Sequence, residues 1–319
     1  MKVFLTSPLP GNAVEMLLAE GFDVTVFSKN RGIKKEELIR YASDADALIT
    51  LLSDKIDSEV IGALSRCRII ANYAVGYNNI DLKAAAQKKI TVTNTPDILT
   101  DATADIAMSL VLACARNIVE GEKMVRAGRF KGWKADLLLG MELKGKTFGI
   151  IGAGRIGSAT ARRAKAFGTN IVYYSRTAKP QLEKETGAKK LSLKALLKTS
   201  DIISLHLPLN EKTRHLLDKE HLALMKSNAI LINTARGEIT DEKELIRMLK
   251  EKKIFSAGFD VYENEPDINK ELLKLPNVVL IPHLGSATFE ARANMAALCA
   301  QNTANVLKGK KALTPVTKK

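Results

Sequence analysis

The sequence is poor in the residues that indicate a disulfide-stapled, metal-binding or membrane-spanning protein. It has three cysteines in 319 residues, Cys67, Cys114 and Cys299, which are scattered among apolar neighbours. That usage favours buried thiols in a reducing compartment. No Cys-x-x-Cys or His-Glu-x-x-His run is present, so we predict no metal site. The longest apolar runs, such as residues 106–115, are too short and too interrupted to span a bilayer.

Aromatic residues are also scarce, at 5% of the chain with a single tryptophan. The net charge of +14 is a possible sign of nucleic-acid binding, but stacking platforms for single strands need aromatic side chains. The basic residues are mixed with acids, as in residues 34–37, and the denser stretches near the C-terminus resemble a solvated tail. We therefore predict no nucleic-acid partner and no membrane partner, and a positive field that attracts small anions. Residues 1–6 read as a strand rather than a secretory signal, and a cytoplasmic protein is expected.

Strands and helices alternate along the first hundred residues. Short apolar or β-branched runs are separated by segments with helical spacing, which is typical of a parallel sheet covered on both faces. The predicted strands are 3–7, 24–28, 47–52, 69–75 and 90–93, and the predicted helices are 13–19, 35–41, 58–64 and 82–87.

A second alternating series occupies the rest of the chain. It is preceded by a predicted helix from residue 102 to about 127, which Gly128 would end. The last helix, at about 289–307, has no strand after it and could pack back on the first domain. The six predicted strands are 147–151, 171–174, 202–205, 230–233, 256–259 and 278–281.

These patterns predict an α/β protein made of two doubly wound parallel-sheet domains. A Rossmann dinucleotide-binding domain is expected at residues 101–286. A smaller, flavodoxin-like substrate domain is expected at residues 1–100 plus 287–319, and it would be discontinuous in sequence. The cleft between the domains would then hold the substrate.

A glycine turn, Gly-Ala-Gly-Arg-Ile-Gly, directly follows the strand at 147–151 and opens a helix. Gly152 would make the tight turn, Gly154 would let the backbone approach a pyrophosphate, and Gly157 would let the helix pack on the strand. The free amides near Arg155 and Ile156 would face the phosphates. The pattern alone is weak, but its place between a strand and a helix favours a dinucleotide site.

The residues after the next strand suggest which dinucleotide is bound. Sites that prefer NAD place an acid there to bond the ribose 2′-hydroxyl, but this chain has Ser175, Arg176 and Thr177. A guanidinium between two hydroxyls can bind a 2′-phosphate. We therefore predict that NADP(H) is preferred, and NAD(H) stays possible if Arg176 is only a solvated loop residue.

The chain has only four histidines, so the search for a proton carrier is short. His215 and His221 lie in charged stretches, where surface roles are expected. His206 ends a strand on the cofactor side and could border the dinucleotide. His283 also ends a strand there, before a Gly-Ser turn, and is the candidate proton donor.

Two further polar residues complete a possible site for reducing a 2-keto acid. Arg236 ends another strand and offers a forked, permanent charge for a carboxylate or a carbonyl oxygen. Glu265 could hold the imidazole of His283 and favour its protonated form. Taken singly, Arg236 could be a surface charge, Glu265 a turn acid before Pro266, and His283 a loop-packing residue.

Several longer stretches resemble one family in sequence and in order along the chain. They are residues 71–81, 92–96, 145–157, 233–237, 258–266 and 282–286. Through them the chain resembles the D-isomer-specific 2-hydroxyacid dehydrogenases, and it is most similar to their glyoxylate/hydroxypyruvate reductase branch. The resemblance implies NAD(P)H-dependent reduction of a small anionic 2-keto acid to the D-2-hydroxy acid or glycolate.

The resemblance also implies roles for particular residues. Arg236 would bind substrate, His283 would be the acid/base, and Glu265 would be its partner. Backbone amides of Val75 and Gly76 would hold the substrate carboxylate, while Leu52 and Ser53 would line the pocket. The implied cofactor contacts, besides those named above, are Pro208, Thr213, Thr234, Ala235, Asp260 and Gly285, with Asp260 bonding the carboxamide. A homodimer joined through residues 121–146, with Trp133 near the neighbour's site, is also implied.

Two alternatives remain open at this stage. A slightly larger pocket would suit another 2-keto acid, such as 2-ketogluconate. The second alternative is a protein of a different class. It is a dinucleotide-sensing interaction protein, similar to the corepressors of this fold, and it stays open because fold alone does not settle function.

Overall fold

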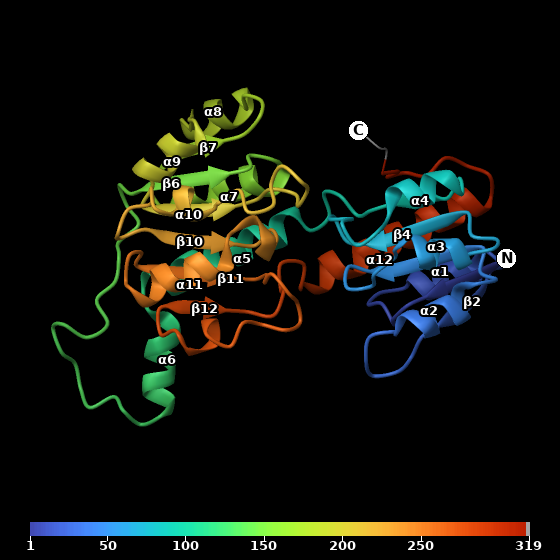
Figure 1. Ribbon diagram of the computed structural model, residues 1–319, viewed down its shortest axis with the longest axis horizontal. Helices are drawn as coiled ribbons and strands as arrows, with labels where there is room; N and C mark the ends of the chain where they lie inside the picture. Colours follow the sequence, from blue (N-terminus) through green and yellow to red (C-terminus); the bar gives the residue numbers. More distant parts are fainter. Residues whose placement is uncertain (317–319) are drawn as a thin grey trace. The chain divides into compact units, whose positions relative to one another are not determined.

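The computed structural model describes residues 1–316 and divides the chain into two compact units. Unit 1 combines Met1–Leu99 with the C-terminal segment that begins at Ser286, and unit 2 is Thr100–Gly285. The predicted boundaries fall one residue further along the chain at both junctions. Each unit is built on one parallel sheet (Figure 1), so the predicted fold class is confirmed.

Unit 1 has a five-stranded parallel sheet in the order β2-β1-β3-β4-β5. This is the strand order of flavodoxin-like folds. The central strands are apolar runs that are buried almost completely, as expected for a sheet covered on both faces. The strands are β1 (Lys2–Leu5), β2 (Asp23–Val26), β3 (Ala47–Leu51), β4 (Ile69–Tyr73) and β5 (Thr91–Thr93).

The helices of unit 1 cover this sheet. The C-terminal helix α12 (Phe289–Leu307) packs against β4 and α1, so the two ends of the chain belong to one unit. Aspartates cap two of the shorter helices: Asp57 accepts from the amide of Val60, and Asp81 accepts from the amides of Lys83 and Ala84. The helices are α1 (Ala13–Ala19), α2 (Lys35–Ala42), α3 (Ser58–Ala63) and α4 (Leu82–Gln87).

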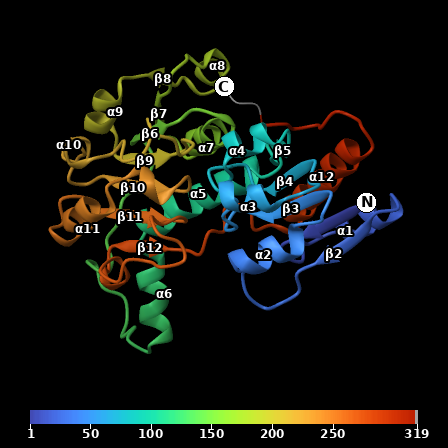
Figure 2. The same ribbon diagram turned by 45° about the vertical axis from the view of Figure 1, so that its right-hand side comes forward.

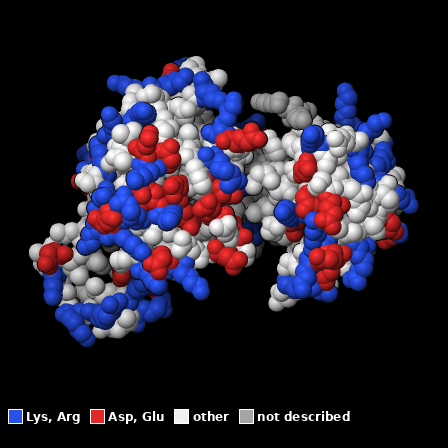
Figure 3. Space-filling view, in the orientation of Figure 1, with Lys and Arg blue, Asp and Glu red and all other residues white. Residues whose placement is uncertain are grey.

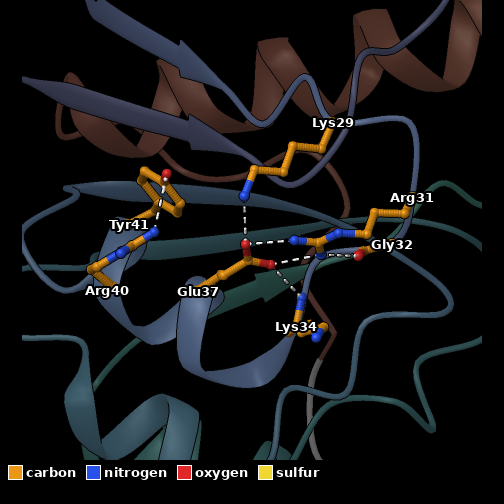
Figure 4. Close-up of polar contacts among 7 residues, drawn as sticks. All are labelled: Lys29, Arg31, Gly32, Lys34, Glu37, Arg40 and Tyr41. Atoms are coloured by element: carbon orange, nitrogen blue, oxygen red, sulfur yellow. Dashed lines mark hydrogen bonds and ion pairs between the residues drawn. The ribbon is translucent and has the colours of Figure 1, made fainter.

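Basic residues of the loop after β2 are neutralised by one acid on α2. Oε1 of Glu37 accepts from Nζ of Lys29 at 2.8 Å, and Oε2 accepts from Nη1 of Arg31 at 2.7 Å (Figure 4). The Lys34 amide also donates to Oε2, at 3.2 Å. Hydrogen bonds from Arg31 and Lys29 hold the pKa of Glu37 well below its usual value. Part of the positive charge of the chain is therefore used locally, to fix a loop.

Unit 2 has a seven-stranded parallel sheet in the order β12-β11-β10-β9-β6-β7-β8. The six predicted strands are present, and their order matches the dinucleotide-binding fold. A seventh strand, β8, was missed because it is two exposed lysines without an apolar pattern. The strands are β6 (Thr147–Ile151), β7 (Asn170–Tyr174), β8 (Lys189–Lys190), β9 (Ile202–Leu205), β10 (Ile230–Asn233), β11 (Ser256–Phe259) and β12 (Val278–Leu280).

Alternate residues of these strands enter two separate cores. Phe148 and Ile150 of β6 face the core that contains α5 and α7, whereas Ile151 faces the core that contains α9 and α11. The period of two follows from strand geometry and gives each face of the sheet its own helical cover. The helices of unit 2 are α5 (Thr100–Ala115), α6 (Ile118–Arg126), α7 (Arg155–Ala166), α8 (Pro180–Thr186), α9 (Leu193–Thr199), α10 (Lys219–Leu222) and α11 (Glu242–Lys250).

The prediction of one helix over residues 102–127 is wrong. The segment forms α5 and α6, which meet at an angle of 67°. Asn117 between them has a φ of 51°, a left-handed conformation that ends a helix, and its side chain donates to the carbonyls of Leu138 and Leu139. The apolar pattern continues across the break, so periodicity alone does not reveal it. In Figure 1 and Figure 2, α6 and the segment after it extend away from the sheet of their unit.

No single helix within residues 1–316 is long and apolar enough to cross a membrane, although α5 and α6 pass that test as a bent pair. Eight of the 16 residues of α5 are buried inside the protein. On the face drawn in Figure 3, Lys and Arg are interspersed with Asp and Glu.

Candidate active site

The glycine turn joins β6 to α7 at the carboxyl edge of the unit 2 sheet. Gly152 has a φ of 101°, and a Cβ added there would lie 2.6 Å from the carbonyl oxygen of His206. A Cβ added at Gly157 would lie 2.2 Å from the carbonyl oxygen of Gly152. Both contacts are too close for any side chain, so these two glycines are required by packing alone.

Gly154 is different, because packing does not explain it. It is the N-cap of α7, and no atom lies within 4 Å of a Cβ added there. The first amides of a helix have no acceptor within the helix, and α7 begins directly after Gly154. Together with the helix dipole, they offer a binding place for an anion. The open space beside Gly154 therefore fits a pyrophosphate.

The strand end next to the glycine turn carries the residues predicted to select the cofactor. The Gly152 amide donates to the carbonyl of Tyr174 at 2.9 Å, so residues 175–177 begin beside the turn. The Ser175 hydroxyl bonds the carbonyl of Thr177, and the side chains of residues 176 and 177 are exposed. Nζ of Lys190, on β8, lies 3.4 Å from the carbonyl oxygen of Arg176 and adds a second positive charge. Sequence reasoning missed this lysine.

The loop after β9 also lies beside the glycine turn. Oγ of Ser204 is 2.9 Å from Nε2 of His206, and burial lowers the pKa of His206 to about 3. His206 is therefore neutral near pH 7 and unsuited to donate a proton. Thr213 donates to the carbonyl of Pro208 at 2.6 Å, which closes the loop. These three predicted cofactor residues thus belong to one loop that faces the turn.

Two other histidines, His221 and His215, are each hydrogen-bonded to an acidic residue. Nδ1 of His221 lies 2.9 Å from Asp218, its helix-capping neighbour in α10. Nε2 of His215 lies 3.2 Å from Glu263.

Arg236 follows β10 in a loop shaped by the buried side chain of Asn233. The Asn233 amide donates to the carbonyl of Arg236 at 2.8 Å, and its oxygen accepts from the Ala235 amide at 3.0 Å. Burial lowers the pKa of Arg236, while the nearby Glu265 and Glu238 act in the opposite direction. A guanidinium keeps its charge in any protein environment, so a half-buried cation is held here. The position of Asn233 at a strand end was the available signal for its role.

Thr234, between these residues, has a buried hydroxyl that lacks a partner within the described chain. A buried polar atom without a hydrogen bond is costly, and native proteins leave few of them. A polar atom of a bound ligand would satisfy it. With the open space at Gly154, this hydroxyl shows that the edge of the sheet fits an extended polar ligand such as a dinucleotide.

Glu265 and His283 form a direct hydrogen-bonded pair. Oε2 of Glu265 lies 2.8 Å from Nδ1 of His283, and Oε1 accepts from the Tyr262 amide at 2.9 Å, which orients the carboxylate. Burial acts to raise the pKa of Glu265, but the bond with His283, the Tyr262 amide and the charge of Arg236 together lower it. The carboxylate therefore stays ionised and can stabilise a protonated imidazole.

Residues 283–285 are held in place from two sides. His283 has a φ of 53°, and the two amides after it both donate to the carboxylate of Asp260, the one from Gly285 at 2.8 Å. Thr103 of α5 donates to the carbonyl of Gly285 at 2.9 Å. Burial raises the pKa of Asp260. Asp260 thus fixes the histidine loop, in addition to the cofactor contact predicted for it. Thr103, 182 residues away in sequence, carried no signal that could have found it.

The predicted substrate residues of unit 1 follow two neighbouring strands of its sheet. Leu52 and Ser53 come directly after β3, and Val75 and Gly76 come shortly after β4. Parallel strands end at the same edge, so these loops are neighbours within unit 1. Asp54 holds the first loop, because its carboxylate accepts from the Leu51 amide at 2.7 Å and from the Thr6 hydroxyl. Burial raises the pKa of Asp54.

Within residues 1–316, no three His, Cys, Asp or Glu side chains are grouped so that they could hold a metal ion. The cysteines Cys67, Cys114 and Cys299 are buried and free. The three candidate catalytic residues, Arg236, Glu265 and His283, lie in one unit.

Comparison with known proteins adds three kinds of similarity. The model of the D-isomer specific 2-hydroxyacid dehydrogenase NAD binding domain matches residues 108–285. The chain is 52% identical to a glyoxylate reductase from Thermococcus kodakarensis over 305 residues, which covers 94% of this chain and 91% of that protein.

Two solved structures are similar over nearly the whole chain. A protein from Thermus thermophilus matches with a TM-score of 0.94 and 43% identity, covering 99% of this chain and all of that one. An NADPH-dependent glyoxylate/hydroxypyruvate reductase from Sinorhizobium meliloti, solved with NADP and malonate, matches with a TM-score of 0.88 and 32% identity, covering 99% and 96% of the two chains.

The contrast between Gly154 and Gly157 gives a test of the cofactor site. Replacing Gly154 with Ala should leave the thermal stability of the ligand-free protein within about 0.5 kcal/mol, because its Cβ meets nothing. The same change should raise the Kd for NADPH about tenfold or more, because the methyl group would occupy the space proposed for pyrophosphate. Gly157→Ala should lower both stability and affinity, because its Cβ would overlap the Gly152 carbonyl.

Calorimetry would measure the stability, and fluorescence titration would measure the NADPH affinity. Gly62→Ala is the control for affinity, since it adds a methyl group to open space in unit 1. Because Gly62 lies in α3, where alanine is the better helix former, the change should raise stability slightly and leave the NADPH affinity unchanged. If the Gly154→Ala variant bound NADPH with the wild-type Kd, the phosphates would have to bind elsewhere.

Proposed function

The chain belongs to the D-isomer-specific 2-hydroxyacid dehydrogenase family, and from this membership we propose that it reduces glyoxylate or hydroxypyruvate to the 2-hydroxy acid. The observation that carries the proposal is the 2.8 Å hydrogen bond between Glu265 and His283, in the same unit as the half-buried Arg236. The similar proteins described above include a glyoxylate reductase and a glyoxylate/hydroxypyruvate reductase, which supports the substrate class. The cofactor is a nicotinamide dinucleotide, which when bound would supply the hydride to the keto carbon.

The proposed roles of the chain's own residues follow from their contacts. Nδ1 of His283 is held by Glu265, so Nε2 is the atom that would give its proton to the carbonyl oxygen of the substrate. The product then carries a new C–H bond from the hydride and a new O–H bond from the imidazole. Glu265 stabilises the imidazolium that is needed before this transfer. Arg236 would bind the carbonyl oxygen and the carboxylate, where its fixed charge stabilises developing negative charge.

Residues of unit 1 are also proposed to bind the substrate. The backbone amides of Val75 and Gly76 would donate to the substrate carboxylate, and Leu52 and Ser53 would line the pocket near the substituent on the keto carbon. Leu52 and Ser53 are exposed on their loop, and Val75 and Gly76 are half-buried. A cytoplasmic location stays a prediction from the sequence.

Removing the proposed proton donor gives the test of this function. His283→Ala should lower kcat for glyoxylate and hydroxypyruvate by about two to four decades, because general acid catalysis is lost. The Kd for NADPH should change little. The rate of NADPH oxidation is followed by absorbance with a panel of glyoxylate, hydroxypyruvate and 2-ketogluconate.

His221→Ala is the matched control, since that ring is bonded to Asp218 in α10 and has no proposed role. Full turnover in His283→Ala would remove the residue from the mechanism. A preference of the wild-type protein for 2-ketogluconate would change the substrate, and no turnover with any keto acid, despite NADPH binding, would favour a dinucleotide-sensing protein.

We further propose that NADPH is preferred over NADH. None of residues 175–177 is acidic, and two cations, Arg176 and Lys190, lie at this strand end. A carboxylate there would repel a 2′-phosphate, whereas a guanidinium attracts it. The structure of the Sinorhizobium meliloti relative, which contains NADP, is consistent with this choice.

Replacing Arg176 with Ala should lower the ratio of kcat/KM for NADPH to that for NADH by about tenfold, because one charge-assisted contact to the 2′-phosphate is lost. Steady-state kinetics with both cofactors measure the ratio. Lys165→Ala removes an equal charge from the far end of α7 and should leave the ratio unchanged. A tenfold advantage of NADH in the wild-type protein would be contrary to the proposal.

A homodimer joined through residues 121–146 is also proposed. The segment carries large apolar side chains in water: Val125 is 64% exposed, Phe130 is 52% exposed and Trp133 is 83% exposed. No residue of α6 is buried in the single chain. Clustered exposed apolar residues of this kind mark protein–protein contacts.

Changing Val125 and Phe130 together to Asp should turn the dimer into a monomer at micromolar concentration, because two charges would be buried without partners. Analytical ultracentrifugation measures the mass. Leu18→Asp, at a 53% exposed leucine of α1, is the control that should stay dimeric. A monomeric wild-type protein, or a dimer that survives both changes, would be the contrary result.

A further inference from the structure

Three consecutive carbonyl groups in the loop after β4 are each bound by a donor from within unit 1. The Thr95 amide donates to the carbonyl of Ala74 at 2.9 Å. The side-chain amide of Asn94 donates to the carbonyl of Val75 at 2.9 Å. That of Asn72 donates to the carbonyl of Gly76 at 2.8 Å. The loop therefore has its carbonyl groups tied down one after another.

The direction of the next amides follows from this arrangement. The peptide bonds in the loop are trans, so each N–H points away from the carbonyl before it in the same peptide plane. The amides of Val75, Gly76 and Tyr77 are thus turned away from the groups that bind the carbonyls. None of the three donates to an acceptor among the residues that the structure describes. Successive unpaired amides of this kind form an anion-binding concavity.

The two asparagines are themselves held in place by further contacts. Asn72 is fully buried, and its oxygen accepts from the Thr50 hydroxyl and from the side chain of Asn79, each at 3.2 Å. Asn79 also donates to the carbonyl of Leu51 at 3.1 Å, which ties the loop after β3 to the same group of amides.

The second asparagine, Asn94, is fixed by its backbone. Its carbonyl accepts from the hydroxyl of Thr314 at 2.6 Å, and its own amide donates to the Thr314 carbonyl at 3.3 Å. A residue anchored at the backbone leaves its side chain few positions, so the donor to Val75 is held with little freedom.

We propose that Asn94 and Asn72 are positioning residues for the substrate carboxylate, and that the amide of Tyr77 is a third donor beside those of Val75 and Gly76. Asn94 fixes the peptide plane that presents the Gly76 amide, and Asn72 fixes the plane that presents the Tyr77 amide. The inference rests on the proposed function, because the keto acid supplies the carboxylate. It identifies two side chains, remote from the reacting atoms, as determinants of substrate affinity.

Asn94→Leu tests the proposal, because it removes the donor while keeping the same number of side-chain heavy atoms in the same branched shape. Without this bond the Val75 peptide is free to rotate, and the Gly76 amide is lost to the carboxylate. We expect the KM for glyoxylate to rise about tenfold, which corresponds to one hydrogen bond to a charged group. The kcat should stay within about threefold, because the carboxylate is bound alike in ground and transition states.

A matched control and a second variant separate positioning from general damage. Asn277→Leu is the same change at a half-buried asparagine of unit 2, whose side chain donates to the carbonyls of Leu249 and Phe255, and it should leave KM unchanged. Asn94→Ala removes the same donor with a smaller side chain. It replaces Asn94→Leu in the test if the leucine variant does not fold.

Direct observation of the amides distinguishes this inference from the proposed reaction. Oxalate is titrated into the NADPH complex, and the ¹⁵N–¹H signals of residues 75–77 are followed. The wild-type signals of all three amides should shift, and the Kd for oxalate should rise about tenfold in the Asn94 variants. Unshifted signals in the wild-type protein, or equal Kd values in a folded Asn94 variant, would overturn the inference. Shifted signals without turnover of any keto acid would support it while removing the proposed reaction.

Discussion

In a parallel sheet every strand ends at the same edge, and both sheets of this chain are parallel throughout their described strands. Residues that follow different strands are therefore gathered without being near one another in sequence. In unit 2 this places the glycine turn after β6, residues 175–177 after β7, His206 after β9 and Arg236 after β10 along one edge. In unit 1 it does the same for the loops after β3 and β4.

Loops at these edges take their shape from polar side chains that are buried just beyond the strands. Asn233 binds the backbone before and at Arg236, Asp260 binds the two amides after His283, and Asn72 binds the carbonyl of Gly76. Each of these side chains replaces the strand partner that the backbone loses when it leaves the sheet. Buried backbone groups must be satisfied, so the same bonds that allow the loop to exist also fix the directions of its remaining donors.

Charge at the candidate site is balanced within the site itself. Burial would disfavour the ionised forms of both Arg236 and Glu265, but each lies close enough to the other to offset part of that cost. Glu265 in turn bonds Nδ1 of His283 through a carboxylate that the Tyr262 amide already orients. A site balanced in this way holds a cation and the proposed proton donor without an unpaired buried charge.

The two parallel-sheet domains, the glycine turn and the short set of candidate polar residues all follow from the amino-acid sequence alone. Strand periodicity, glycine spacing and the scarcity of histidines are local properties, and each can be recognised within a few residues. The break of the predicted long helix at Asn117 was not visible, because the apolar pattern of α5 continues into α6 while the side chain of Asn117 binds carbonyls about 20 residues further along.

The pairing of each hydrogen-bond donor with its acceptor, in contrast, depends on how the chain folds in three dimensions. The bond from Thr103 to Gly285 spans 182 residues, and the bond from Asn94 to Val75 joins the ends of two different strands. Such pairings depend on sheet register and on the packing of α5 over the sheet. A hydrogen bond requires its donor and acceptor to lie about 3 Å apart in space. The spacing of two residues in the sequence does not show whether they reach that distance.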